Sequence, residues 1–180
     1  MFPIRGTREG SAPQMRLHSK GQALLETALY LPFLFLFLFG TVELGKVVYT
    51  YFALQKALYS IGRLAATAQG INLCDSGDPI LAGIENVVLT GSSDGQGTPI
   101  IQGLAATDIQ IRVERFDPVN NVLNICDCSV NGCDIAAGGL SPDFIVISLT
   151  NGYQVGPVFP LFRVDPFPLR PQIRMPFGGS

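Results

Sequence analysis

The sequence predicts an α+β protein in which a long N-terminal membrane-spanning helix extends outward and is packed by a small antiparallel β-sheet domain. Two observations carry this prediction. From Thr27 to Val42 the chain has 16 residues without a charge, and several segments further along alternate between apolar and polar residues as strands do. Hydrophobic residues make up 47% of the 180 residues and charged residues only 14%, which is well below the quarter usual for soluble domains.

The uncharged run is the first element. It includes seven alternating Phe and Leu residues, 33–39, and a helix that is apolar all round does not suit a protein surface. A helix of this length covers about 24 Å, and the flanking residues extend it to the ~30 Å of a hydrocarbon core. We therefore expect a transmembrane helix over residues 22–44, a buried core helix being the alternative. The residues after the run, 40–44, resemble no signal-peptidase site, so the segment is expected to stay on the protein.

The charge distribution sets the expected orientation. Residues 1–21 form a basic leader, which contains four of the 12 basic residues and one of the 14 acidic residues. The rest of the chain has a net charge of −5. The positive-inside rule places such a leader in the cytoplasm. The sequence thus predicts a single-pass protein of the inner (cytoplasmic) membrane with its C-terminal region outside. Its mildly acidic outer part gives no support to nucleic-acid binding, which needs Lys and Arg to neutralise phosphates.

The junction between leader and span carries the main functional signal. Gly21 follows the basic leader, and Glu26 lies five positions later at the edge of the apolar helix. This is the layout of a prepilin-type cleavage site, cut between Gly21 and Gln22, where glycine leaves an extended backbone open to a peptidase. A carboxylate beside a bilayer is costly and is usually paired and functional. The layout resembles that of pilin-like filaments, in which the partner of Glu26 would be the new α-amino group of a neighbouring subunit, which aligns the helices in register.

The segment 21–32, with its continuation through 40–45 and 57–66, resembles the TadE-like family of pilin-like proteins of tight-adherence (Flp-type) pili. That family typically has an aromatic residue after the glutamate, where this chain has Thr27. The resemblance implies a non-enzymatic pseudopilin subunit or assembly factor of a tight-adherence type IV pilus or secretion system, in the membrane or in the pilus itself. The implied partners are other pilins and pseudopilins, the tight-adherence assembly machinery, a prepilin peptidase and the lipid bilayer. The alternative is an unprocessed, signal-anchored envelope scaffold or binding protein.

The helix is expected to continue beyond the membrane over residues 45–70. Apolar residues there recur every three or four positions, as in a heptad seam. Such a stripe packs either on the chain's own globular part or on neighbouring pilin helices, and both can hold at different heights. Pro32 lies inside the span and is expected to kink the helix locally. The seam consists of Val47, Tyr51, Leu54, Leu58 and Ile61, continued by Ala65 and Ala68.

Residues 71–156 are expected to form a small extracytoplasmic α+β region. The pattern predicts a short helix over 79–90 and strands over 108–116, 119–125 and 144–149. Asn151 and Gly152 predict a hairpin turn after the third strand, with 153–155 beginning the return. The tail, residues 157–180, holds six of the 13 prolines and is expected to be extended and irregular. A docking strap for partner subunits is the functional alternative for this tail.

The cysteines Cys74, Cys126, Cys128 and Cys133 all follow the span, on the side expected to be oxidising. Their even number favours two disulfides. A bond between Cys126 and Cys128 would be strained, so Cys74 is expected to be tied to this loop, with the pairing otherwise open. A zinc site is the alternative, but the first Cys pair lacks the usual spacing.

No enzyme is predicted, and neither a cofactor nor a metal is expected. The sequence shows no nucleophile–base set, no phosphate-binding loop and no metal motif, and its single histidine, His18, lies in the leader. The paired acids Asp75/Asp78 and Asp127/Asp134 fall in loops and are expected to be solvated.

Overall fold

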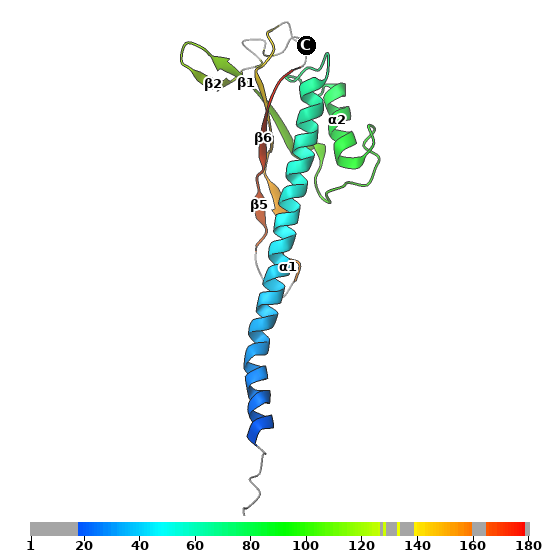
Figure 1. Cartoon of the computed structure of the whole chain (residues 1–180). Coiled ribbons are helices and arrows are strands. Elements are labelled where there is room, and N and C mark those ends of the chain that lie inside the picture. Colours follow the sequence, from blue (N-terminus) through cyan, green and yellow to red (C-terminus); the bar gives the residue numbers. More distant parts are fainter. Residues whose placement is uncertain (1–17, 127, 129–132, 134–138, 160–164, 179–180) are drawn as a thin grey trace, which may run out of the picture. The chain divides into compact units, whose positions relative to one another are not determined.

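The computed structural model of the chain describes residues 18–126, 128, 133, 139–159 and 165–178 (Figure 1). The chain divides into two compact units, residues 1–42 and 43–180, and the long helix α1 (His18–Thr67) contributes to both. Within the described residues, α1 is the helix long and apolar enough to span a membrane. The leader before His18 lies outside the described residues.

Helix α1 begins at His18 rather than at residue 22, so the last leader residues are helical. It continues without interruption past Pro32; the kink expected there stays a prediction. It ends at Thr67, three residues before Gly70, which has a left-handed φ of 71°. Glycine adopts that conformation without a steric penalty, and the predicted end of the helix is therefore close to the observed one.

Helix α2 (Pro79–Thr90) has the predicted bounds. Its first turn is capped by the carboxylate of Asp78, which accepts hydrogen bonds from the backbone N–H groups of Ile80 and Leu81 at 2.8 and 3.1 Å. Gly91, with a φ of 78°, closes the other end. The prediction that Asp78 is a solvated loop residue was wrong. This side chain is buried because it satisfies the free N–H groups of a helix start.

The main sheet has the strand order β2-β1-β3-β6, with antiparallel neighbours. Strands β1 (Ile109–Asp117) and β3 (Phe144–Leu149) follow the prediction, and the 3-10 turn η1 (Ala106–Asp108) precedes β1. Strand β2 (Val122–Ile125) is shorter than the predicted 119–125. The carboxylate of Asp117 accepts hydrogen bonds from the backbone N–H groups of Val119 and Asn120. The first residues of the predicted strand therefore form a turn instead.

The hairpin predicted after β3 was wrong. Strand β4 (Tyr153–Val155) pairs with β5 (Phe167–Leu169) in a separate two-stranded sheet. Both edges of β3 are already occupied, by β1 and by β6 (Gln172–Pro176). The tail is therefore more regular than expected, since β5 and β6 both lie in it. Strand β6 is an edge strand, the position in a sheet where proline is tolerated.

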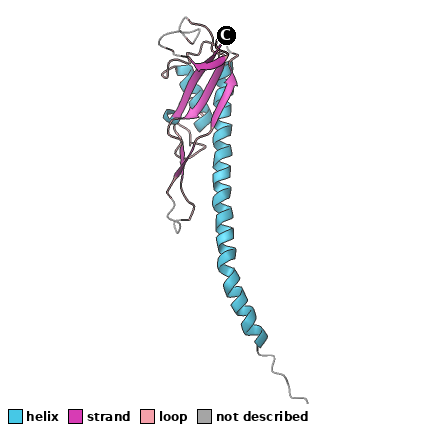
Figure 2. Cartoon of the chain, turned by 90° about the vertical axis from the view of Figure 1, so that its left-hand side faces the viewer, coloured by secondary structure: helices cyan, strands magenta, loops and turns pink. Residues whose placement is uncertain are grey.

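Helices α1 and α2 contribute to one hydrophobic core with the sheet. Figure 2 shows the strands beside the C-terminal part of α1. The seam residues Leu54, Leu58 and Ile61 are fully buried in this core, whereas Val47 is half-buried and Tyr51 is exposed. The chain's own domain thus covers the upper part of the seam. The core side chains of the sheet are Val113, Ile145, Ile147 and Leu149.

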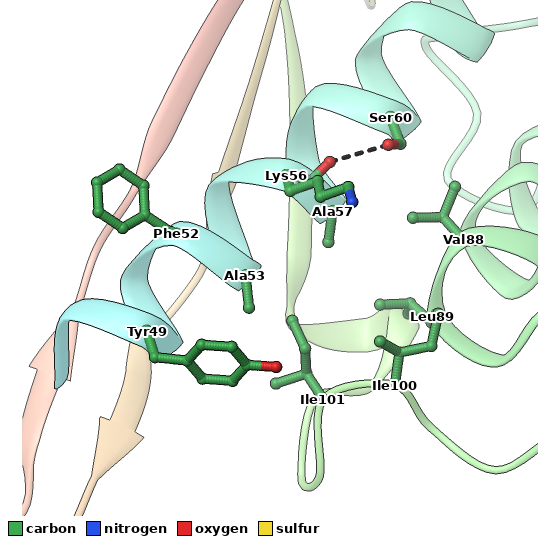
Figure 3. Close-up of a pocket in the computed structure, with 10 residues that line it drawn as sticks. All are labelled: Tyr49, Phe52, Ala53, Lys56, Ala57, Ser60, Val88, Leu89, Ile100 and Ile101. Atoms are coloured by element: carbon green, nitrogen blue, oxygen red, sulfur yellow. Dashed lines mark hydrogen bonds between the residues drawn. The ribbon is translucent and has the colours of Figure 1, made fainter. Parts of the chain in front are cut away.

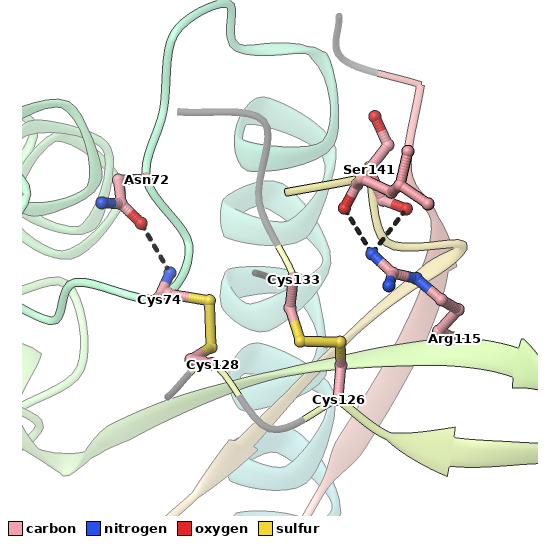
Figure 4. The surroundings of a disulfide bond; sticks show 8 residues. Asn72, Cys74, Arg115, Cys126, Cys128, Cys133 and Ser141 are labelled. Carbon is pink, nitrogen blue, oxygen red and sulfur yellow. Dashed lines mark hydrogen bonds between the residues drawn. A yellow bond between two sulfur atoms is a disulfide. The ribbon is translucent and has the colours of Figure 1, made fainter. Parts of the chain in front are cut away.

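Two disulfides join the loops at one end of this domain (Figure 4). Cys74 is bonded to Cys128, with a Cα–Cα distance of 5.5 Å, and Cys126 to Cys133, at 5.8 Å. The first bond links the α1–α2 connection to the segment after β2. Cys133 is buried in the core. Asp127 and Asp134, which the sequence suggested were solvated, lie outside the described residues.

Candidate assembly surfaces on helix α1

Gly21 lies inside helix α1, not in the extended backbone expected at a cleavage site. A Cβ built on it meets no atom within 4 Å, so packing among the described residues does not require glycine here. Glycine inside a helix costs about 1 kcal/mol relative to alanine. A peptidase that needs extended backbone would have to unwind this turn, and glycine makes the unwinding easier.

Gln22 and Glu26 lie one helical turn apart and contact each other. The amide of Gln22 donates a hydrogen bond to a carboxylate oxygen of Glu26 at 3.2 Å, and both side chains are exposed. Thr27 turns its hydroxyl back onto the helix and donates to the carbonyl oxygen of Ala23 at 2.8 Å. The structure thus brings together the residue after the expected cut and the carboxylate expected to act in assembly.

The apolar part of α1 within residues 21–42 is exposed on all sides of the helix. Phe35 and Phe39 stack on each other with ring centroids 5.9 Å apart, so some aromatic contacts are made within the helix. An all-round apolar surface suits lipid or other helices and not water. The most exposed large side chains are Leu24, Leu25, Tyr30, Phe33, Leu36 and Phe37.

A second apolar surface lies on α1 beyond the uncharged run. We name it the outer stripe; it consists of Leu44, Val48, Tyr49, Phe52 and Tyr59. These side chains are 44% to 77% exposed. Leu44, Val48 and Phe52 follow each other at intervals of four, so they share a helix face, and it differs from the face that buries Leu54 and Leu58. The sequence analysis missed this surface because it assigned a single seam to the helix.

The outer stripe adjoins an apolar groove of about 430 Å³ (Figure 3). One wall is α1, from Tyr49 to Ser60, and the other is formed by the end of α2 and by Ile100 and Ile101. The backbone N–H of Ile100 donates to the carbonyl oxygen of Leu89 at 2.8 Å, which holds the second wall together. Lys56 supplies the charged group of the lining.

A polar contact between the first residues of the second unit and the segment after strand β4 was also missed by the sequence analysis. One carboxylate oxygen of Glu43 accepts the backbone N–H groups of Val158 and Phe159, at 2.7 and 2.9 Å. The ammonium group of Lys46 donates to the carbonyl oxygen of Gly156 at 2.8 Å. We call these three bonds the Glu43 clamp. Its partners are more than 100 residues apart, so no local pattern reveals it.

No group of His, Cys, Asp and Glu side chains that could hold a metal ion is found among the described residues. The cysteines that the structure describes are all in disulfides.

Comparison with known proteins identifies one segment. Residues 21–63 match the family model described as TadE-like protein, which confirms the resemblance seen in the sequence. The match covers about a quarter of the chain and includes Gly21, Glu26, Glu43 and the whole outer stripe. No curated protein and no solved structure matches the chain.

Proposed function

From the TadE-like segment at residues 21–63, we propose that this chain is a non-enzymatic, pilin-like subunit or assembly factor of a tight-adherence pilus. The segment 22–44 holds it in the cytoplasmic membrane, with the leader inside and the domain outside. Its partners are other pilins and pseudopilins and the assembly machinery of the pilus. A prepilin peptidase removes the leader between Gly21 and Gln22.

The observation that carries this proposal is the outer stripe. Large apolar side chains that are exposed together beyond the span mark an interaction surface. The opposite side of the same helix is used by the chain's own core, through Leu54 and Leu58. A helix that is apolar on both sides is normally buried between two partners. One partner is the domain of this chain, and we assign the other side to a neighbouring subunit.

Glu26 has a separate role in this proposal. It lies at the start of the span, exposed and bonded to the neutral amide of Gln22. A carboxylate at this depth is stabilised by a cation, and cleavage before Gln22 creates one on every subunit. Pairing between Glu26 and the amino group of a neighbour would set the register of adjacent helices.

The outer stripe is tested by the variant Phe52→Ser, with Phe116→Ser on strand β1 as the control. Both phenylalanines are exposed, so both variants should fold and reach the membrane at wild-type levels. We expect Phe52→Ser to reduce the number of surface pili, since it places a hydroxyl in the assembly surface, and Phe116→Ser to leave it unchanged. Equal pilus numbers in the two variants would remove the evidence for the stripe.

The processing step is tested by the mass of the protein isolated from cells that bear pili. We expect the mass to lack residues 1–21. An intact leader on the protein in active pili would instead favour the alternative, an unprocessed signal-anchored scaffold. The variant Glu26→Ala should still be cleaved but assemble poorly; normal assembly would contradict the pairing role of Glu26.

A further inference from the structure

We propose that the segment Gly156–Phe159 is a second membrane contact of this chain, held in the outer headgroup layer of the bilayer by the Glu43 clamp. This inference concerns a lipid surface and goes beyond the proposed function. It rests on one part of that function, the membrane span.

The clamp fixes the height of the segment. The uncharged run ends at Val42, and Glu43 is the next residue. At 1.5 Å per residue, Glu43 and Lys46 lie within about 6 Å of Val42 along the helix axis. Their bonds to Gly156, Val158 and Phe159 place that backbone at the same height, where the helix leaves the hydrocarbon core.

Three backbone polar groups of the segment are bonded to side chains of α1, which suits a medium poor in water. Pro157 has no N–H group. The N–H groups of Val158 and Phe159 are bonded to the carboxylate of Glu43, and the carbonyl oxygen of Gly156 is bonded to Lys46. Irregular backbone is excluded from the hydrocarbon region because unpaired polar groups are costly there. Bonds of this kind let such a segment approach that region and reach the headgroup layer.

The side chains of the segment suit the boundary between headgroups and acyl chains. No charged residue occurs from Tyr153 to Phe159. Val158 is 42% exposed although its backbone is held by the clamp, and Phe167 on the neighbouring strand β5 is equally exposed. The ammonium group of Lys46 is engaged by a carbonyl. We therefore expect insertion by apolar side chains into a zwitterionic bilayer, without a need for anionic lipid.

The chain has no tryptophan, so single tryptophans can report depth. The full chain would be reconstituted in phosphatidylcholine vesicles that contain lipids brominated near the headgroup end of the acyl chains. The test variant is Val158→Trp. Val119→Trp, at the 88% exposed turn after β1, is the control for a water-exposed site, and Phe37→Trp is the control for the span.

We expect roughly twofold quenching by the brominated lipid for Val158→Trp, the result for a side chain 5–10 Å deep at the interface, and no quenching for Val119→Trp. Iodide in the water should quench the two in the opposite order. Adding Glu43→Ala, or Lys46→Met if the former fails to fold, should reduce the lipid quenching of Val158→Trp and raise its iodide quenching.

Each other outcome has a distinct meaning. If Phe37→Trp is quenched by the brominated lipid but Val158→Trp behaves like Val119→Trp, the second contact is refuted and the span stands. If Phe37→Trp is not quenched, the membrane span fails, and this inference fails with it. If quenching of Val158→Trp survives the loss of Glu43 and of Lys46, the clamp does not hold the segment, which overturns the proposal.

Discussion

Gly62 on helix α1 lies close to side chains of strands β3 and β6, and it allows a quantitative test of the packing. A Cβ built on Gly62 would lie 2.8 Å from the sulfur of Met175 on β6 and 3.0 Å from Cδ1 of Ile147 on β3. Both distances are shorter than ordinary van der Waals contacts. The change Gly62→Ala therefore forces these two side chains to move. Gly83 in helix α2 meets no atom within 4 Å and is the matched control.

The expected magnitudes follow from two opposing effects. Replacing glycine by alanine inside a helix stabilises it by about 1 kcal/mol, and both variants gain this. Overpacking a core costs about 1–3 kcal/mol, and only Gly62→Ala meets that cost. The cost lies near the lower end of this range because the obstructing atoms are the ends of the flexible Met175 and Ile147 side chains. The free energies of unfolding of the two variants should thus differ by about 1 kcal/mol, which corresponds to about 3 °C in Tm for a unit of this size.

The assay is thermal unfolding of the full chain in detergent, followed by circular dichroism. Gly83→Ala should raise Tm, and Gly62→Ala should leave it unchanged or lower it. A double variant with Met175→Ala should recover part of the loss, because the nearest obstructing atom is then absent. An equal rise in Tm for Gly62→Ala and Gly83→Ala would refute the close contact between α1 and β6.

Three further predictions concern the same domain. Leu58→Ala, at a fully buried position, should lower the free energy of unfolding by about 2–5 kcal/mol. Phe52→Ala on the outer stripe should change it by less than about 1 kcal/mol. Similar losses for the two variants in denaturant titrations would place Phe52 in the core. Burial raises the pKa of Glu85 from 4.5 to about 7, so the folded state takes up a proton and stability falls as pH rises through this window. Glu85→Gln should therefore unfold at the same denaturant concentration as wild type at pH 4. At pH 8 it should be more stable than wild type by about 1–2 kcal/mol, a value reduced for partial solvent screening. A stability difference between variant and wild type that does not change with pH would contradict the raised pKa. Replacing both cysteines of a disulfide by serine should lower the free energy of unfolding by about 4 kcal/mol for Cys74–Cys128, which closes 54 residues, and by about 2 kcal/mol for Cys126–Cys133, which closes seven. The reverse order in denaturant titrations would contradict these pairings.

The elements that the sequence predicted well carry their own local signals. Helix α2 starts at a proline preceded by a capping aspartate and ends before a glycine, which are start and stop signals readable from a few residues. Strand β3 is a continuous apolar run, and β1 alternates between apolar and polar residues. The long apolar helix that could span a membrane is recognised from its length and lack of charge alone. In each of these cases the deciding interactions lie within the element.

The errors occurred where the deciding partner is distant. Strands β5 and β6 are short and contain proline, so their sequences do not predict strands; β6 forms because β3 offers an open edge. Because β6 occupies that edge of β3, β4 cannot pair with β3 in the predicted hairpin. Asp78 is the exception, because its partners Asn72, Ile80 and Leu81 are near in sequence. Its capping role was readable from the helix start that follows it, and the sequence analysis overlooked it.

The candidate site divides in the same way. Gly21 and Glu26 were singled out from a linear motif, which combines their spacing with the basic leader before them and the uncharged run after them. The outer stripe was not found, because a helix with apolar residues on two sides gives a periodicity that does not tell which side is buried. The Glu43 clamp joins residues 110 or more positions apart, and only a folded chain reveals it.

The two disulfides have a consequence for how the chain reaches its native cysteine pairing. The alternative pairing, Cys74–Cys126 with Cys128–Cys133, would close loops of 52 and 5 residues, against 54 and 7 in the structure. Loop-closure entropy depends only weakly on such differences, so oxidation of an unfolded chain does not discriminate between the two sets. Correct pairing is therefore selected by exchange once the domain begins to pack, and burial of Cys133 then protects the result. An oxidase alone should give a mixture, and the yield of mature protein should depend on a disulfide isomerase.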